Sequence, residues 1–287
     1  MPKPCHRRSA RDWLHPLERV PHQDDVFSLR RSGDERAGLA DQFFKAADIF
    51  DRFRRQLDRQ QVYEGVDAYT RQAFDVLTSS KMIEAMDLAV GRLLASLEAL
   101  GLDDETLVVF TSDNGGFAGV SDCRPLRESK GHLYEGGIRV PMIVRWPGRV
   151  KPGTLSDEPG GSMDFYPTFL EVAGLKPTGN KPIDGESLVS LFQQTGKPKR
   201  GELFFHFPNY AWHMDNRLGG AVRAGDHKLI RNYDDGSVEL YNLKLDLGET
   251  ANLAKRQPEI AARLNRKLGQ WLADTGAWMP KPPKPKP

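Results

Sequence analysis

Two short groups of polar residues could carry chemistry in this chain of 287 residues. Asp113 and Asn114 directly follow the apolar run 107–110 and precede two glycines. A short apolar run closed by glycine predicts a fully buried parallel strand, and ligands bind outside the carboxyl ends of such strands. Lys130 and Arg139 follow on a glycine-rich loop. A carboxylate, an amide and two cations near one strand end indicate half of an anion-and-metal site.

The elements that must position these residues are predicted from periodicity. A helix over 79–100 has one apolar stripe and ends at Gly101, and a short acidic link then leads into the strand. A second strand is predicted over 138–146. Pro141 lies inside that run, so the strand is near a sheet edge or begins after the proline. Helix followed by strand is typical of α/β winding.

The flanking segments complete the predicted organisation. Helices are expected over 39–57, 164–173 and 187–192. Short strands at 221–223, 227–231 and 238–243 predict a small antiparallel sheet, and Pro258 suits the first turn of a helix over 258–273. The fold class is therefore α/β, with a C-terminal antiparallel sheet packed by a C-terminal helix. Three parts are expected: an irregular lead-in over 1–37, part of an α/β domain over 38–195, and an α+β sub-domain over 196–287 with an extended Pro/Lys tail.

Composition narrows the classes of partner. A formal net charge of +2, with 41 basic against 39 acidic residues, argues against nucleic acid. No apolar run is long enough to cross a bilayer, so no membrane partner is expected. Cys5 and Cys123 form neither a disulfide framework nor a metal-ligand spacing. The basic N-terminus has no apolar region of a secretory signal, which predicts a cytoplasmic location for the chain as written.

Several blocks, in order, resemble the sulfatase family of the alkaline-phosphatase superfamily. They are SDNGG, PLRESKGHLYEGGIRVPMIVRWPG, SMDFYPTFLEVAGL, IDGESLVSLF, LFFHFPNY, GAVRAGDHKLI and ELYNLKLDLGETANLA. The resemblance covers roughly residues 79–280. It implies a sulfatase-like sheet, hydrolysis of a sulfuric ester, and a sulfated small molecule or carbohydrate as the partner. Relatives in this family are usually periplasmic or secreted.

The resemblance also implies roles for individual residues. Asp113 and Asn114 match ligands of a divalent metal, usually calcium, for which hard oxygen ligands are suited. Lys130 matches the lysine that contacts the sulfate ester and supports its transfer. His206 resembles a substrate-side histidine, and His132 is a further substrate-binding candidate. The alternatives from the residues alone are an ordinary Asx turn at Asp113 and a solvated surface lysine.

One half of the family's site is missing from the sequence. The resemblance implies a formylglycine made within a C-x-P-x-R block near the N-terminus. No such block occurs in that region, since the segment after Cys5 lacks the proline. His15, in WLHPL, resembles a histidine that protonates the leaving alkoxide, with His22 as the alternative candidate. A calcium site of one carboxylate and one amide is incomplete.

Two functional hypotheses follow. The first is a sulfatase by family, given as its C-terminal portion and not competent on its own. The alternative is a non-catalytic remnant that binds sulfated or phosphorylated ligands or complements a separate N-terminal chain. Phosphatase chemistry, a third option, needs a Ser or Thr nucleophile that the sequence does not place.

Overall fold

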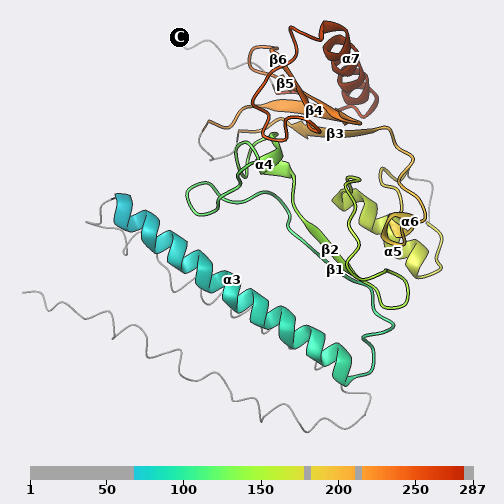
Figure 1. Cartoon of the computed structure of the whole chain (residues 1–287). Coiled ribbons are helices and arrows are strands. Elements are labelled where there is room, and N and C mark those ends of the chain that lie inside the picture. The colour runs from blue at the N-terminus through green and yellow to red at the C-terminus, as the bar shows by residue number, and fades with distance from the viewer. Residues whose placement is uncertain (1–67, 178–181, 211–214, 281–287) are drawn as a thin grey trace, which may run out of the picture. The chain divides into compact units, whose positions relative to one another are not determined.

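The computed structural model describes residues 68–177, 182–210 and 215–280 (Figure 1). The chain divides into two units, Met1–Val66 and Asp67–Pro287, and every described residue belongs to the second. The predicted lead-in, the helix expected over 39–57 and the candidates Cys5, His15 and His22 lie outside the described residues. The predicted domain boundary at 195/196 stays a prediction.

The first described element is the long helix α3, Ala68–Ala99. It begins earlier than the helix predicted over 79–100 and ends where the sequence indicates. Gly101 follows in the left-handed region at φ 65°, and its amide donates to the Glu98 carbonyl at 2.9 Å. Among the described helices, none combines the length and the apolar character needed to cross a bilayer. The cytoplasmic location stays a prediction.

Strand β1, Val108–Thr111, pairs antiparallel with β2, Met142–Arg145. The register runs from Val108 opposite Arg145 to Thr111 opposite Met142, and the Phe110 side chain is 41% exposed. The prediction of a fully buried parallel strand is therefore wrong for the described residues. An apolar run reports hydrophobicity but not the direction of its partner, which is set here by the chain's return through residues 112–141.

Pro141 explains where β2 begins. The strand starts at the next residue, as one of the two predicted alternatives required, because proline cannot donate to a sheet ladder. Of the residues expected to be strand before Pro141, Ile138 is the last residue of the short helix α4, Glu135–Ile138, and residues 139 and 140 lie in neither a helix nor a strand. The apolar run over 138–146 thus divides between a helical turn and a strand.

In sequence order, short helices follow the first sheet. They are η4 (Ser162–Asp164), α5 (Phe165–Val172) and α6 (Val189–Phe192), close to the helices predicted over 164–173 and 187–192. Gly174 follows α5 at φ 66° as the predicted stop. Leu188, Leu191 and Phe192 form a small buried cluster against Met142 and Val144 of β2, so α6 is anchored on the first sheet.

The C-terminal part confirms the predicted antiparallel sheet with its helix. Four strands pair in the order β3-β4-β5-β6. Their bounds are β3 Glu202–Phe207, β4 Gly219–Ala224, β5 His227–Asn232 and β6 Val238–Asn242. Strand β3 was not among the three predicted, and α7, Pro258–Asp274, begins at the predicted proline.

Both faces of this sheet are covered. On one face, Val222, Leu229 and Leu240 pack against α7, and Figure 1 shows α7 beside the strands of this sheet. On the other face, Ala221, Ile230 and Tyr241 pack against Leu133 and Tyr134 of the loop that carries Lys130. Successive strand residues point to opposite faces, so β5 sends Leu229 to the helix and Ile230 to the loop. The C-terminal sheet therefore packs against the loop that carries Lys130.

Candidate active site

Two backbone hydrogen bonds bring the candidate segments together. The amide of Gly115 donates to the Gly137 carbonyl at 2.9 Å, and the amide of Lys130 donates to the Gly116 carbonyl at 2.9 Å. Asp113 and Asn114 immediately precede this contact, at the end of β1. The structure thus joins the two polar groups that the sequence singles out.

Glycines allow the two backbone segments to approach this closely. A Cβ placed on Gly115 would lie 1.7 Å from the carbonyl oxygen of Gly136. A Cβ on Gly136 would lie 2.2 Å from the Glu128 carbonyl oxygen, and one on Gly137 would lie 2.1 Å from that of His132. A side chain at Gly115 would force the loop away from the end of β1, and one at Gly136 or Gly137 would push apart backbone segments within the loop itself.

The described residues do not complete a metal site by themselves. Asp113 is exposed, Asn114 is partly buried, and the Ser112 hydroxyl donates to the Asn114 carbonyl at 2.8 Å. Calcium takes six to eight oxygen ligands. Over residues 68–177, 182–210 and 215–280, no group of three or more His, Cys, Asp or Glu side chains could hold a metal ion. Asp113 and Asn114 can therefore supply only part of the coordination shell of such an ion.

His132 lies on the same loop as Lys130, and its side chain is 9% exposed. Its Nδ1 is 3.2 Å from the Ser129 carbonyl oxygen, which can only accept, so Nδ1 carries a hydrogen. Within the described part of the chain, the buried Nε2 has no hydrogen-bond partner, and it lies 3.9 Å from Oε2 of Glu128. In the neutral ring, Nε2 is therefore free to accept a hydrogen bond. Its predicted role in substrate binding stays a prediction.

His206 has contacts within the C-terminal part. It lies on β3, with Nδ1 2.8 Å from the Tyr233 hydroxyl and Nε2 2.8 Å from the Trp278 carbonyl oxygen. Because a carbonyl only accepts, Nε2 donates, and Nδ1 accepts from the Tyr233 hydroxyl in the neutral ring. These bonds tie the segment after α7 to the sheet. They do not test the predicted substrate-side role of His206.

A buried charge cluster fastens the loop to the sheet. Nζ of Lys228 lies 2.9 Å from Oε1 of Glu135 and 3.0 Å from Oε1 of Glu249. The Lys228 and Glu249 side chains are fully buried, and that of Glu135 is 3% exposed. Burial raises the pKa of Glu249, and the nearby Lys228 ammonium acts in the opposite direction. Arg139, 3.4 Å from Oε2 of Glu135, adds a second cation.

A second cluster, partly exposed, lies beside it. The Arg127 guanidinium stacks 3.9 Å from the centre of the Tyr134 ring and donates to the Tyr241 hydroxyl at 2.9 Å. Both tyrosine hydroxyls donate to the Glu239 carboxylate. Burial, followed by the Glu239 charge or its hydrogen bond, raises the pKa of Tyr134 and of Tyr241, so both remain neutral donors. Arg127 also donates to the Glu249 carbonyl at 3.1 Å, which links the two clusters.

Asp246 stabilises the turn that carries Glu249. Its carboxylate accepts from the amides of Thr250 and Ala251, each at 2.9 Å. Burial raises the pKa of Asp246, but the hydrogen bonds from Ala251 and Thr250 outweigh it and hold this pKa below its ordinary value. The ionised form is therefore favoured in the folded state.

Replacing Asp246 with alanine is expected to lower the free energy of unfolding by about 0.5–1 kcal/mol at neutral pH, allowing for solvent screening. Because the folded pKa is depressed, this contribution is present above the ordinary carboxyl value of about 3.9 and is lost as the pH falls through the folded value. Urea denaturation of both proteins between pH 7 and pH 2.5 measures the difference. A gap that widens as the pH falls would contradict the assignment.

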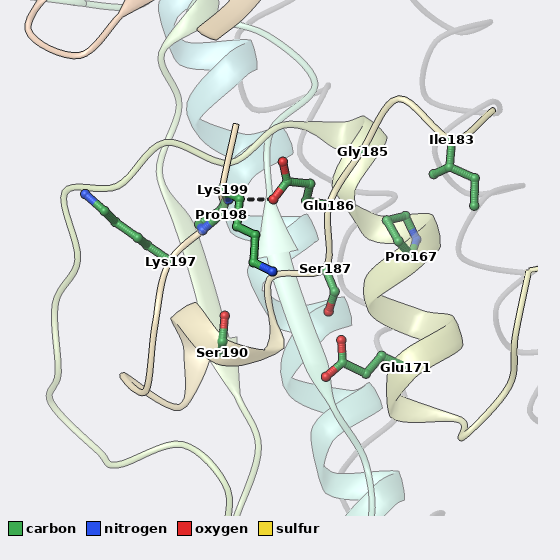
Figure 2. A pocket seen from close by; sticks show the side chains of 10 residues that line it. All are labelled: Pro167, Glu171, Ile183, Gly185, Glu186, Ser187, Ser190, Lys197, Pro198 and Lys199. Atoms are coloured by element: carbon green, nitrogen blue, oxygen red, sulfur yellow. Dashed lines mark hydrogen bonds between the residues drawn. The ribbon is translucent and has the colours of Figure 1, made fainter. Parts of the chain in front are cut away.

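A shallow, open cavity of about 540 Å³ lies elsewhere in the described structure (Figure 2). Its lining residues come from α5, α6 and the segments that flank α6: Pro167, Glu171, Ile183, Gly185, Glu186, Ser187, Ser190, Lys197, Pro198 and Lys199. Oε2 of Glu186 accepts from the Lys199 amide at 2.6 Å, and Lys197 pairs with Glu158 at 3.1 Å. The cavity contains none of the predicted site residues.

Comparison with known proteins identifies the family. The sequence profile of the N-sulphoglucosamine sulphohydrolase C-terminal family matches residues 129–274, and that of the Sulfatase family matches residues 41–175. The chain belongs to the sulfatase family. This confirms the resemblance carried by the SDNGG and KG-x-x-x-EGG blocks. Both profiles include Lys130 and the loop that closes on β1.

Individual relatives agree with this family assignment. A sulfatase of Formosa agariphila is 40% identical over 225 residues, which are 68% of this chain and 40% of that protein. The structure of BT4656 in complex with its substrate D-glucosamine-2-N,6-O-disulfate aligns with a TM-score of 0.56 and 31% sequence identity. The alignment covers 67% of this chain and 39% of that one. Ps i-CgsB with k-i-k-neocarrahexaose aligns at 0.61 and 27% identity, over 79% and 48%. The chain thus spans less than half the length of these relatives.

The sequence prediction missed the residues that support the site. Lys228 and Glu249 are buried beneath the loop, and neither was a candidate. The sequence does contain a signal for Lys228. Alternate residues of a strand share a face, so Lys228 lies on the same face as the apolar Ile230, opposite to Leu229. A lysine at an inward-facing strand position requires a buried partner. The sequence did not say which carboxylates provide it.

Proposed function

We propose that this chain forms part of the active site of a sulfatase that hydrolyses a sulfuric ester. The observation that carries the proposal is the bond from the Lys130 amide to the Gly116 carbonyl at 2.9 Å, beside Asp113 and Asn114. This juxtaposition, in a chain of the sulfatase family, supports the assignment of all three residues to one site.

In this proposal, Lys130 binds the sulfate group. Its ammonium offsets negative charge on the transferring sulfuryl group and on the leaving oxygen, where charge develops in the transition state. A flexible ammonium with three donors can follow that charge as the bond breaks. The Lys130 amide donates to the Gly116 carbonyl at 2.9 Å, so its backbone is held while its side chain can rotate.

Asp113 and Asn114 are proposed as two of the ligands of a calcium ion, with the remaining ligands outside the described residues. When bound, a divalent cation would polarise the sulfate oxygens. The nucleophile of the whole enzyme, a formylglycine in the family, is likewise proposed to come from a segment outside the described residues. The proposed contribution of this part of the chain is therefore charge neutralisation and substrate orientation.

A sulfated carbohydrate is the proposed substrate class. This rests on the similarity to the structure of BT4656 in complex with its substrate, D-glucosamine-2-N,6-O-disulfate. The site is at an open end of β1, where Asp113 is exposed and Lys130 is partly buried. An exposed strand end can receive a sugar carrying a sulfate ester without entry into a closed cavity.

Replacing Lys130 with alanine is expected to weaken binding of D-glucosamine-2-N,6-O-disulfate by about 10- to 100-fold, because one charge-assisted contact is lost. Isothermal titration calorimetry in the presence of calcium measures the change. Lys151→Ala, at an exposed lysine in the turn after β2, is the matched control and should leave the affinity unchanged. Equal effects of the two substitutions would overturn the role of Lys130.

A second candidate function is binding of a sulfated ligand without hydrolysis, or completion of the site by a separate N-terminal chain. The observation that favours it is the limited set of groups that the described residues bring together: one lysine and two oxygen side chains. Release of inorganic sulfate from the same sugar distinguishes the two functions. Calcium-dependent binding without sulfate release would favour the second candidate.

A further inference from the structure

We propose that Lys228 and Glu249 are positioning residues that hold the Lys130 loop against the end of β1. The inference rests on the proposed function, because it assigns the pair to the orientation of the proposed sulfate-binding lysine. Neither residue was a predicted site residue. Both lie in the C-terminal part, far from Lys130 in sequence.

The first observation is the place of Lys228 on its strand. It lies on the loop-facing side of β5 with Ile230, whereas Leu229 faces α7. The Lys228 side chain is fully buried, so its ammonium depends on protein partners alone. Those partners are Glu135, at 2.9 Å, and Glu249, at 3.0 Å. An ammonium between two buried carboxylates fixes the distance from the sheet to the loop.

The second observation is the bond that Glu249 makes with the loop backbone. Its Oε2 accepts from the amide of Glu135, the first residue of α4, at 2.6 Å. Glu249 itself is in the left-handed region at φ 51°, which is unusual for a residue other than glycine. Its Oε1 contacts Lys228, so one carboxylate joins the sheet cation to the start of α4.

From α4 the connection to Lys130 is short and consists of backbone contacts. The amide of Gly136 donates to the Arg127 carbonyl at 2.8 Å, and the carbonyl of Gly137 accepts from Gly115 at 2.9 Å. A movement of α4 would therefore separate the loop from the segment that follows β1. Lys130 lies between these two anchored points and would move with the loop.

The basic and acidic side chains around Lys228 depend on one another for their partners. Each of the two basic groups, of Lys228 and Arg139, lies within 3.4 Å of a carboxyl group of Glu135 or Glu249. Removing the buried ammonium leaves two buried carboxylates facing each other, and such a change strongly destabilises the partners that remain. The nearest consequence is release of the α4 segment, because it contributes one of these carboxylates.

Hydrogen exchange measured by mass spectrometry on the full chain tests the proposal. Lys228→Met is expected to speed exchange of the amides in 128–137 by at least about 100-fold. Glu249→Gln, which keeps the shape and one acceptor oxygen, is expected to speed it by about 10-fold. The control is Arg231→Met, the other cation of β5, whose guanidinium donates to Asn265 of α7 at 3.2 Å on the opposite face. It should leave exchange in 128–137 within about 2-fold of the parent.

The outcomes separate this inference from the proposed function. Faster exchange in 128–137 with β4 and β5 still protected supports positioning, whatever the sugar affinity. Unchanged hydrogen exchange in 128–137 of the Glu249→Gln variant would overturn the positioning role. Equal acceleration of that exchange in the Arg231→Met variant would overturn it as well. If Lys228→Met does not fold, Glu249→Gln decides the matter. Binding of D-glucosamine-2-N,6-O-disulfate is measured in parallel. A mobile loop in Glu249→Gln, combined with a Lys130→Ala variant of unchanged affinity, supports positioning and rejects the sulfate role.

Discussion

Replacing Gly115 with alanine is expected to lower the free energy of unfolding by about 3 kcal/mol or more. The added methyl group would lie 1.7 Å from the Gly136 carbonyl oxygen, and a backbone atom cannot rotate away as a flexible side chain could. The Gly115–Gly137 hydrogen bond would be lost with the close approach. The variant should also lose the affinity that depends on Lys130, since the loop and the end of β1 would separate. Urea denaturation followed by circular dichroism, with calorimetry of sugar binding, measures both effects.

Gly91→Ala provides the matched control. Gly91 lies within α3, and, apart from the backbone of that helix, a Cβ at this position would meet no atom within 4 Å in the described part of the structure. The same substitution there should leave stability unchanged or raise it by up to about 1 kcal/mol, because alanine favours helix. If Gly115→Ala were as stable as Gly91→Ala, the close approach of the two backbone segments would be wrong.

Replacing Arg200 with methionine is expected to lower the free energy of unfolding by about 3–5 kcal/mol. Arg200 pairs with both carboxylate oxygens of Asp164, whose side chain is fully buried. The same carboxylate accepts from the amides of Gly161, at 2.8 Å, and Glu186, at 2.9 Å. Without the guanidinium, a buried charge would remain without a counter-ion at the junction of η4, α5 and the segment before α6. The midpoint of urea denaturation reports the loss.

An exposed ion pair supplies the comparison for Arg200. Arg217 and Asp235 are 2.7 Å apart, with side chains 46% and 50% exposed. Solvent screens such a pair, so Arg217→Met should leave the denaturation midpoint nearly unchanged. Similar losses in the two variants would show that burial of Asp164 does not govern the stability of this junction.

Much of the fold and of the site can be predicted from the sequence. Glycine at 101 and at 174 marks the helix ends, Pro258 marks a helix start, and alternation identifies three of the four strands of the C-terminal sheet. These signals are local, because each depends on a backbone preference or a short periodicity. The SDNGG and KG-x-x-x-EGG blocks were sufficient to indicate the family, which the sequence profiles confirm.

The remainder depends on contacts between distant residues. The direction of β1 is set by its pairing with β2 through the intervening loop, and an apolar run contains no record of that partner. The Lys228–Glu135 contact spans 93 positions, so neither residue type nor spacing predicts it. The packing of the Lys130 loop on the C-terminal sheet likewise joins residues far apart in sequence, so the sequence pattern does not predict it.

Asp113, Asn114 and Lys130 are proposed to form one site for a sulfate ester. A nuclear magnetic resonance titration of the nitrogen-15-labelled chain with D-glucosamine-2-N,6-O-disulfate in calcium buffer tests this directly. We expect the amides of all three residues to shift together along a single saturation curve. Shifts at Lys197 and Lys199 of the cavity between α5 and α6, with none at Lys130, would contradict it.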